Sequence, residues 1–405
     1  MRSKLLTLLV VLLSAVALLG AETSPVERPP AAGPAQAAPP GEAGCLILSQ
    51  GQLMAPPDTT VTGLDTTVVQ GGGQAFGVRA PVRLSIADAG SSRSATAALG
   101  SRTGLVWAEC AAPVTQTMLQ LPDPATSDIV LLNTDGTDAV VNLTLYGADG
   151  EVIESGARGL SVARRSSRVV PMSVLAPAGE PVGVAVRTSQ GRIIATARLS
   201  ARAGGLDQAL GLEPAQRQVV AGVPAKVTRV SLLLTNPGAE PVTASISILG
   251  ARGAFTPSGQ ESVELEPMST RALDLTTAVN GEPAAVRVDA NRGEIAASLH
   301  VRLGADAALI PASEPSTDAL VHAPGGTLHL VNPSDDDITV EVAGQSLSVA
   351  AGALVTLPVR AGANRVTGGP VVAVLVSNRG LAARRVLQVR ETESGAQVSN
   401  DPGLR

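Results

Sequence analysis

The stretch "LLTNPGAEPVTASISILGARG", Leu233 to Gly253, decides the fold because the chain repeats its outline twice. An earlier copy reads "LLNTDGTDAVVNLTLYGADG" from Leu131 to Gly150, and a later copy reads "HLVNPSDDDITVEVAG" from His329 to Gly344. Each copy has an Asn, then a turn of polar, Gly or Pro residues, then alternating apolar residues. The sequence therefore predicts three tandem copies of one structural unit.

The match between the first two copies extends well beyond these stretches. Asn133 and Asn236 lie 103 residues apart, and later residues keep the same spacing. Examples are the pairs Gly147/Gly250, Ser166/Ser269 and Arg168/Arg271. Chance similarity in a chain rich in Ala and Val does not keep Gly and Pro in register, so we interpret the match as a true repeat.

The third copy is shorter in its middle. Asn332-Pro333 stands for Asn236-Pro237 at a spacing of 96 residues, whereas Pro370 is aligned with Pro283 at a spacing of 87. On the same alignment "SNRG" (Ser377–Gly380) corresponds to the earlier "ANRG" (Ala290–Gly293). The sequence thus predicts that the third unit lacks some residues of the second but ends in the same way.

Apolar residues alternate with polar ones inside each copy, as Val141, Leu143 and Leu145 do with their neighbours. Alternation turns one set of side chains to a core and the other to water, which is typical of β-strands. About seven short runs of this kind lie between Ile129 and Leu199, and "GADGEV" (147–152) and "TSQGRI" (188–193) indicate hairpin turns. We predict an all-β fold of three tandem immunoglobulin-like β-sandwich repeats. The alternative is a propeller-like arrangement of β-sheets.

The predicted boundaries follow from the repeat and from the composition of the N-terminal part. They are residues 1–21 for a signal peptide or N-terminal anchor, 22–43 for a Pro/Ala-rich linker, 44–115 for a Cys-bridged N-terminal β region, 116–206, 207–312 and 313–391 for repeats 1 to 3, and 392–405 for a disordered tail.

The N-terminus has the pattern of an export signal. Arg2 and Lys4 precede an apolar stretch from Leu5 to Leu19, which has the length of a signal-peptide core and is short for a membrane span. We expect either cleavage or retention as an anchor, with membrane contact only through this segment if it is uncleaved. The Pro/Ala-rich linker that follows is expected to act as a semi-extended spacer.

Two cysteines, Cys45 and Cys110, are the only ones in the chain. An exported protein meets an oxidising environment, and an even count predicts one disulfide. A pair so far apart lacks the spacing of metal ligands. Trp107, three residues before Cys110, is expected to pack over the bridge.

Composition limits the functions that remain. The chain has one Trp, one Tyr and two Phe, so its core must consist of Val, Leu, Ile and Ala. Its net charge of −5 argues against nucleic-acid binding, which usually needs a basic face.

The recurring turn residues are expected to be structural rather than ligand-binding. They are Asn133, Asn236, Pro237, Gly238, Asn332 and Pro333. "NPG" suits a type II turn, in which Pro fixes φ and Gly supplies a positive φ, and the Asn side chain can bond the backbone that follows.

Residues with catalytic or metal-binding chemistry form no motif. His300, His322 and His329 are expected to be structural or surface residues, since none has a zinc-ligand pattern and the first repeat has no His to act as a base. The run Asp335–Asp337 lacks the spacing of a calcium loop. We predict no catalytic residue, no metal site and no cofactor.

The chain resembles a family of secreted actinobacterial proteins catalogued as domain of unknown function 5719. The residues that carry the resemblance are "CLIL" at Cys45, "ECAAP" at Glu109 to Pro113, and the recurring "LLLTNPG" and "ANRGEIAAS". The resemblance implies export and β-rich repeats. It implies no activity, cofactor or catalytic residue.

These observations together favour a non-enzymatic secreted or membrane-tethered protein of the cell envelope. It would serve as a structural scaffold or interaction module for an unknown envelope protein or glycan. The alternative is an envelope glycan-active enzyme, or an accessory subunit, with a site between domains.

Overall fold

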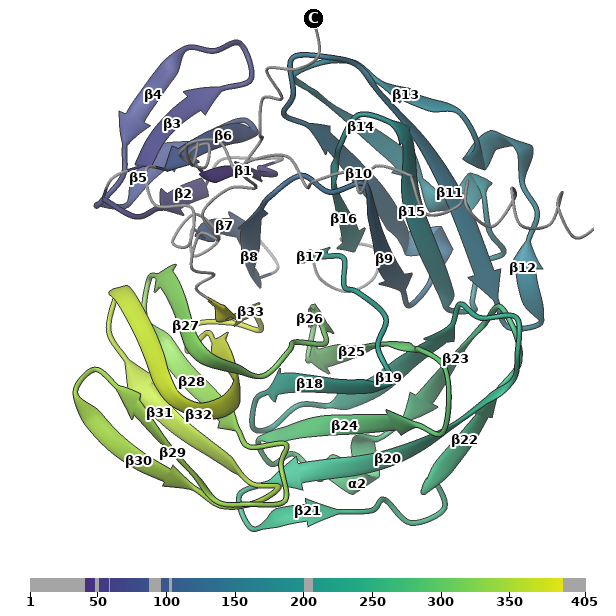
Figure 1. The fold of residues 1–405 in the computed structure, drawn as a ribbon, viewed down its shortest axis with the longest axis vertical. Helices are drawn as coiled ribbons and strands as arrows, with labels where there is room; N and C mark the ends of the chain where they lie inside the picture. The colour runs from purple at the N-terminus through teal and green to yellow at the C-terminus, as the bar shows by residue number, and fades with distance from the viewer. Residues whose placement is uncertain are drawn as a thin grey trace, which may run out of the picture. The chain divides into compact units, whose positions relative to one another are not determined.

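Residues 41–47, 51–57, 59–86, 96–101, 104–199 and 207–388 are described by the computed structural model, and all of them lie in one unit, Pro39–Glu391. The predicted signal or anchor, nearly all of the predicted linker and the predicted tail fall outside the described residues. Almost all regular structure in the described part is β, as the alternating sequence pattern predicted (Figure 1). The strands form several antiparallel sheets that share buried clusters of Val, Leu, Ile and Ala.

The first repeat is a sandwich of two sheets, ordered β14-β10-β16-β17 and β12-β11-β15-β9, with β13 paired to β11. Alternate residues of both sheets, among them Leu131, Leu143 and Val184, meet in one buried cluster. Its strands are β9 (Gln116–Leu121), β10 (Ser127–Asn133), β11 (Ala139–Gly147), β12 (Gly150–Val152), β13 (Leu160–Val162), β14 (Ser166–Pro171), β15 (Val182–Gln190), β16 (Ile194–Leu199) and β17 (Asp207–Leu210). Three short 3-10 helices connect them: η3 (Pro124–Thr126), η4 (Ser155–Ala157) and η5 (Met172–Val174).

The second repeat reproduces the first strand for strand, with sheets ordered β23-β19-β25-β26 and β18-β24-β20-β21, and with β22 paired to β20. Its elements are β18 (Arg217–Val223), β19 (Arg229–Asn236), β20 (Val242–Gly250), β21 (Gly253–Phe255), β22 (Ser262–Leu265), β23 (Ser269–Asp274), the single helical turn α2 (Thr276–Val279), β24 (Ala284–Ala290), β25 (Ala296–Leu303) and β26 (Asp306–Pro311). Side-chain contacts recur as well: Arg168 Nη1 donates to Ser161 O, and Arg271 Nη1 donates to Glu264 O.

The strand order differs from that of an immunoglobulin domain. Lettered along the chain, β9, β10, β11, β14, β15 and β16 correspond to strands A, B, C, E, F and G. An immunoglobulin domain places A with B and E, and G with C and F. Here β9 pairs with β15, and β16 pairs with β10, so strands A and G have exchanged sheets. The hairpin predicted at "TSQGRI" is wrong as well. These residues connect β15 to β16, and the two strands lie in different sheets.

The third repeat departs from the alignment predicted by the "ANRG" and "SNRG" match. Its strands are β27 (Ser316–Ala323), β28 (Gly326–Val331), β29 (Ile338–Val342), β30 (Gln345–Val349), β31 (Leu354–Val359), β32 (Gly362–Val376), β33 (Ala383–Arg385) and β34 (Leu387–Gln388). The first half of β32 pairs with β27 and β29, as β24 pairs with β18 and β20. Its second half pairs with β28, as β25 pairs with β19. One long strand, β32, thus replaces two strands and the turn between them. As a result "SNRG" follows the counterpart of β25, whereas "ANRG" precedes β25.

The N-terminal body, strands β1 to β8, is one eight-stranded sheet ordered β4-β3-β6-β1-β8-β7-β2-β5. Both halves of the sheet contribute to one buried cluster, so the sheet curls around its own core. The strands are β1 (Gly41–Cys45), β2 (Gly51–Met54), β3 (Thr59–Gly63), β4 (Val68–Gly71), β5 (Phe76–Val78), β6 (Val82–Ile86), β7 (Thr96–Ser101) and β8 (Gly104–Ala111).

The four bodies follow one another around a common centre (Figure 1). The innermost strand of each is β8, β17, β26 or β33; β8 packs against β17, β17 against β26, β26 against β33, and β33 against β8. The predicted alternative of a radial arrangement therefore describes how the units are placed, although each repeat is a sandwich and not a single blade.

The first repeat extends past its predicted end at residue 206, because β17 pairs with β16.

A buried polar network joins the first repeat to the second. Gln120 Nε2 donates to Thr235 Oγ1 at 2.9 Å, Thr235 bonds Thr270 at 3.0 Å, and Gly183 N donates to Thr270 Oγ1 at 3.0 Å. A Cβ on Gly183 would lie only 2.5 Å from Thr235 Oγ1. Glycine is therefore required here by the close approach of two sandwiches.

We expect Gly183→Ala to lower the free energy of unfolding by about 1–3 kcal/mol, because the added methyl overpacks this interface and displaces the Thr270 bond. Urea denaturation of the purified protein measures the change. Gly77→Ala is the matched control, since nothing lies within 4 Å of a Cβ built there. Equal effects of the two substitutions would contradict the close-packed interface.

Candidate functional site

The centre of the ring is a buried set of charged side chains contributed by the innermost strands. The buried carboxylates are Glu109 of β8, Asp207 of β17 and Asp306 of β26; of the two guanidinium groups of β33, that of Arg384 is buried and that of Arg385 is partly buried. Arg384 is only 2% exposed and Glu109 only 5%. Charged groups this deeply buried must be paired or hydrogen-bonded to be tolerated.

Each carboxylate accepts a backbone N–H from a neighbouring body. Asp207 accepts from Leu309 N at 2.7 Å, Asp306 accepts from Leu381 N at 2.9 Å, and Glu109 accepts from Arg385 N at 3.0 Å. The bonds run from the first repeat to the second, from the second to the third, and from the N-terminal body to the third. Side chains of the centre thus hold consecutive bodies together.

Arg385 closes the ring by bonding all three other bodies. Its Nη2 lies 2.8 Å from Glu109 Oε2 and 3.4 Å from Gly211 O, and its Nη1 lies 3.4 Å from Ala312 O. Arg384 Nη2 adds a bond to Gln208 O at 3.3 Å. The last β-hairpin of the described chain is therefore the element that joins the end of the ring to its beginning.

The pKa values of two buried carboxylates, Glu109 and Asp207, are shifted in opposite directions. Burial works to raise the pKa of Glu109, but the charges of Arg385 and Arg384 and the bonds from Arg385 outweigh it, so this pKa lies below its ordinary value. Burial raises the pKa of Asp207 to about 7, because the charge of Arg384 and the bond from Leu309 offset it only in part. Asp207 therefore holds its proton in the folded state at pH values where the unfolded chain has lost it.

Asp207 should make the protein less stable as the pH rises from about 4 to 7. The folded state binds more protons than the unfolded state in this window, so stability present below the ordinary pKa is lost as the pH passes the raised one. We expect the free energy of unfolding of Asp207→Asn, minus that of the wild type, to increase over this range. Urea denaturation at several pH values measures it, with Asp149→Asn, at an exposed turn, as control. A difference that does not change with pH would contradict the assignment.

A pocket of about 360 Å³ lies beside the charged centre and is lined by all four bodies. Its walls are segments 111–117, 210–219, 312–315 and 385–386, which follow or end the four innermost strands, together with Ile194 and Ala195 of β16. We call it the axial pocket. Clefts of this size at the meeting point of several domains are the usual place for a ligand.

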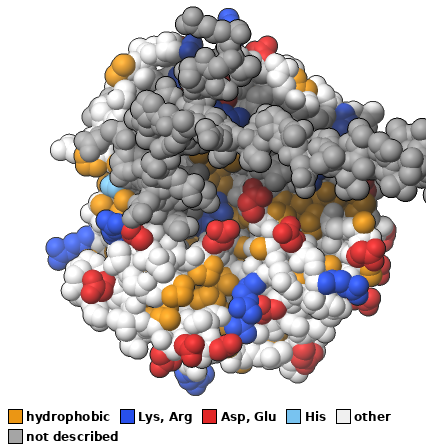
Figure 2. All heavy atoms as spheres, in the orientation of Figure 1, with side chains coloured by type: hydrophobic (Ala, Val, Ile, Leu, Met, Phe, Trp, Pro, Cys, Tyr) orange, Lys and Arg blue, Asp and Glu red, His pale blue; other side chains and the backbone are white. Residues whose placement is uncertain are grey.

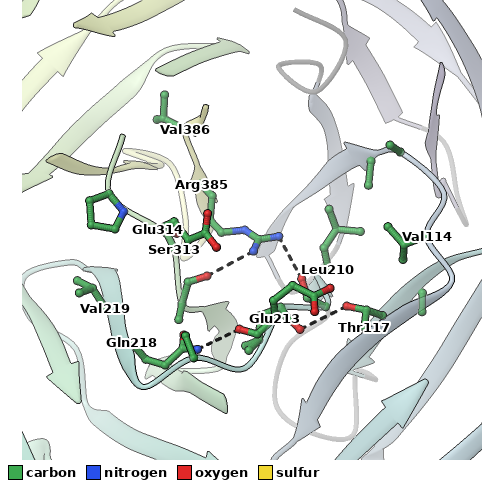
Figure 3. A pocket seen from close by; sticks show the side chains of 18 of the residues that line it. Val114, Thr117, Leu210, Glu213, Gln218, Val219, Ser313, Glu314, Arg385 and Val386 are labelled. Atoms are coloured by element: carbon green, nitrogen blue, oxygen red, sulfur yellow. Dashed lines mark hydrogen bonds between the residues drawn. The ribbon is translucent and has the colours of Figure 1, made fainter. Parts of the chain in front are cut away.

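Four ionisable side chains line the axial pocket: Glu213, Arg217, Glu314 and Arg385. In Figure 3 the two glutamates lie on either side of the Arg385 guanidinium. Arg385 is bound to Glu109, and Arg217 is bound to Asp289. Among the residues that the structure describes, neither glutamate forms an ion pair. Burial, followed by the charges of Glu314 and Glu294, raises the pKa of Glu213.

The three repeat asparagines lie away from this pocket and within their own sandwiches. All are buried, and each bonds the turn that follows it and the strand edge opposite. Asn133 Oδ1 accepts from Asp135 N at 2.9 Å, Asn236 Oδ1 from Gly238 N at 2.9 Å, and Asn332 Oδ1 from Ser334 N at 3.0 Å. Their amide groups donate to backbone carbonyls, for example Asn133 Nδ2 to Val162 O at 3.1 Å. These bonds account for the repetition of the phrase without a ligand.

The predicted type II turn at "NPG" is wrong. Gly238 does not have a positive φ, so the glycine does not serve the purpose assigned to it. The Asn236 side chain instead bonds Gly238 N directly and substitutes for the backbone turn. Pro237 and Pro333 follow their asparagines in the same position of the second and third repeats.

The predicted disulfide between Cys45 and Cys110 is confirmed. The two residues face each other on β1 and β8, the neighbouring strands in the middle of the N-terminal sheet. The predicted role of Trp107 is wrong: its ring belongs to the buried cluster of the third repeat, with Val321 and Leu328, and not to the cluster around the disulfide. Side chains alternate along β8, so Trp107 and Glu109 share the face turned to the third repeat, and Cys110 points the other way.

The histidines and the aspartate run do not meet at any centre. Burial lowers the pKa of His300 and of His329 to about 4, which keeps both neutral at pH 7. Burial also lowers the pKa of His322. Asp337 accepts from Ala351 N at 2.9 Å, while the side chain of Asp335 is 99% exposed. Within the described ranges, no group of three or more His, Cys, Asp or Glu side chains could hold a metal ion.

The charged centre was missed by the sequence analysis. Glu109 lies in the stretch "ECAAP", which carries the family resemblance but no pattern of a charged site. Asp207 and Asp306 begin the strings "DQAL" and "DAAL", and this repetition at the start of two inner strands was the available signal. Arg384 and Arg385 stand in "ARRV", and nothing around them indicates that the strand containing them reaches the centre.

A family model matches the chain. The model described as "Family of unknown function (DUF5719)" matches residues 83–366, well over half of the chain. The chain belongs to this family. The DUF5719 match includes Glu109, Asp207 and Asp306 and ends before Arg384. A comparison of this DUF5719 protein with curated proteins finds no match.

Two further observations concern the environment of the DUF5719 chain. A disulfide is typical of proteins outside the reducing cytosol. Across the described residues, none of the helices has the length and apolar character needed to cross a bilayer.

On the face drawn in Figure 2, acidic and basic side chains are interspersed over the described surface.

Proposed function

We propose that the protein is a non-enzymatic interaction module of the cell envelope, located outside the cytoplasm, with the axial pocket as its binding site. One observation carries the proposal: segments that are far apart in the sequence, from Ala111 to Val386, and that belong to four bodies combine to form one pocket. A rigid ring whose centre is fixed by buried ion pairs presents that pocket as a preformed surface, which lowers the entropic cost of binding.

The charged centre supports a positioning role rather than a reactive one. Glu109, Asp207 and Asp306 each accept a backbone N–H from another body, and the Arg385 side chain is engaged by three acceptor groups, the Glu109 carboxylate and the carbonyls of Gly211 and Ala312. Groups held in this way stabilise the ring. The partner would be an envelope protein or glycan, and an N-terminal anchor or cleaved signal would place the pocket outside the membrane.

Site-specific photocrosslinking in intact producing cells tests the proposal. A photoreactive residue replaces Val114, which lines the axial pocket, in the full-length chain. We expect one discrete covalent product. The same residue at Ile153, which is 88% exposed on a hairpin of the first repeat, is the control and should give no such product. Equal products from both positions, or none from Val114, would contradict a partner at the pocket.

A second candidate function is an enzyme that acts on envelope glycans. The observation that favours it is the presence of Glu213 and Glu314 in one pocket, with the pKa of Glu213 raised by burial and by nearby acidic charges. Glycoside hydrolysis uses two carboxyl groups, one of which acts as a general acid with a raised pKa. Release of reducing ends from isolated envelope glycans, abolished by Glu213→Gln but not by Glu151→Gln, would establish this function in place of the first.

A further inference from the structure

The axial pocket carries more negative than positive charge. Five carboxyl groups, Glu109, Asp207, Asp306, Glu213 and Glu314, lie at the centre or line the pocket, against three guanidinium groups, those of Arg217, Arg384 and Arg385. Asp207 is protonated part of the time at neutral pH, since burial raises its pKa to about 7. The four other carboxylates still outnumber the three guanidinium groups. An incoming ligand therefore meets a negative potential.

Neither arginine of the pocket is free to receive an anion. Arg385 gives its Nε and Nη2 to Glu109, and its remaining described bonds go to the carbonyls of Gly211 and Ala312. Arg217 is paired with Asp289 on the adjacent strand. Glu213 and Glu314, in contrast, are exposed to solvent and have no counterion among the described residues. The unsatisfied groups of the pocket are thus acceptors for a cation.

A second observation points to a missing hydrogen-bonding ligand. Ser313 lines the pocket, and its Oγ is buried without a hydrogen-bond partner in the described structure. A buried hydroxyl normally has a partner, because leaving it unpaired costs free energy. Ser313 adjoins Glu314 in the chain, so this unpartnered hydroxyl belongs to the same wall segment of the pocket as the glutamate.

The rest of the lining is aliphatic. Val114, Leu210, Val219 and Pro315 contribute to the walls, and the described lining contains no aromatic ring. Quaternary ammonium groups are usually held by aromatic cages, whereas a primary ammonium needs hydrogen-bond acceptors. Apolar walls suit an alkyl chain, and a volume of about 360 Å³ accommodates one.

We propose that the axial pocket binds a primary ammonium group at the end of an alkyl chain, with Glu213 and Glu314 as its acceptors. The source is either a free aliphatic diamine or a lysine side chain of a partner protein. This inference rests on the proposed function of the pocket and adds the chemistry that the pocket recognises.

Titration calorimetry with the full chain tests it. The probe is 1,5-diaminopentane, and glutarate, an anion of the same length, is the control ligand. We expect binding of the diamine and none of glutarate. Glu314→Gln and Glu213→Gln should each weaken diamine binding about tenfold or more, since a charge-assisted hydrogen bond is lost. Glu151→Gln, a surface substitution outside the pocket, should leave it unchanged.

A second pair of probes distinguishes the two sources. Nα-acetyl-lysine amide carries the ammonium on a peptide-like body, and its Nε-acetylated form has lost the charge. Binding of the first but not the second supports a lysine side chain, and binding of the diamine alone supports a free diamine. Urea denaturation of each variant shows that it is folded.

Two results would overturn the inference. One is glutarate binding as tightly as the diamine, and the other is diamine binding unaffected by both glutamine substitutions. If the pocket binds a partner through other chemistry, the crosslink from position 114 still forms although the diamine experiment fails. Failure of this inference is therefore distinguishable from failure of the proposed function, in which the crosslink itself is absent.

Discussion

Glu109→Gln should lower the free energy of unfolding by about 3–5 kcal/mol, the usual loss when one partner of a buried ion pair is removed. Glu109 accepts from Arg385 Nη2 at 2.8 Å and from Arg385 N at 3.0 Å, and Arg384 Nη1 lies 4.0 Å away. Glutamine has nearly the same shape but leaves the buried guanidinium group of Arg384 and the partly buried one of Arg385 without their shared counterion. The wild-type contribution is present at neutral pH and is lost as the pH falls through the lowered pKa of Glu109.

Urea denaturation at neutral pH measures this loss, and hydrogen exchange locates it. Amide protons of β8 and β33 should exchange faster in the variant, because the contact between the first and last bodies is weakened. Glu151→Gln removes a surface partner of Arg158 and should cost at most about 1 kcal/mol. Similar losses from the two substitutions would show that the centre does not hold the ring together.

Loss of the disulfide should have an effect of similar size. Cys45 and Cys110 enclose a separation of 65 residues, and constraining the unfolded chain over such a loop contributes about 4 kcal/mol. Both residues are fully buried. The bridge joins β1 to β8, where the two halves of the N-terminal sheet meet. We therefore expect reductant to act only when urea has first opened the protein.

Two measurements separate the crosslink from packing. Wild-type protein reduced in urea and studied under reductant keeps both sulfur atoms, whereas the Cys45→Ala/Cys110→Ala variant loses them. Both should unfold at lower urea concentration than the oxidised protein, and the variant slightly earlier because it also loses buried volume. If reduced and oxidised wild type unfold at the same concentration, the bridge contributes nothing to stability.

The parts of the fold that depend on residues close together in the sequence were predictable. Alternation along β11 and β20 fixes which residues enter a core, and strands β10 to β16 match the seven runs counted between Ile129 and Leu199. The buried asparagines also repeat because they satisfy a local need for hydrogen bonds. Pairing partners are not local. The exchange of β9 and β16 between sheets, and the fusion of two strands in β32, depend on contacts that the alternating pattern leaves open.

The candidate site was not predictable for the same reason. Glu109 and Arg385 are separated by 276 residues and become neighbours only when four bodies are arranged in a ring. Sequence spacing indicates a site when its residues share a turn or a strand, whereas the charged residues of this centre come from four bodies. Trp107 illustrates the same limit, since its sequence neighbour Cys110 lies in another cluster.

The contact between β8 and β33 has a consequence for how such a chain can evolve. Linear arrays of repeats gain or lose single copies easily, because a new copy only adds another interface at one end. In this chain an extra sandwich would separate Glu109 from the arginines that neutralise it. The number of copies is therefore fixed by the geometry of closure, and divergence is expected through loops on the outer hairpins and not through duplication.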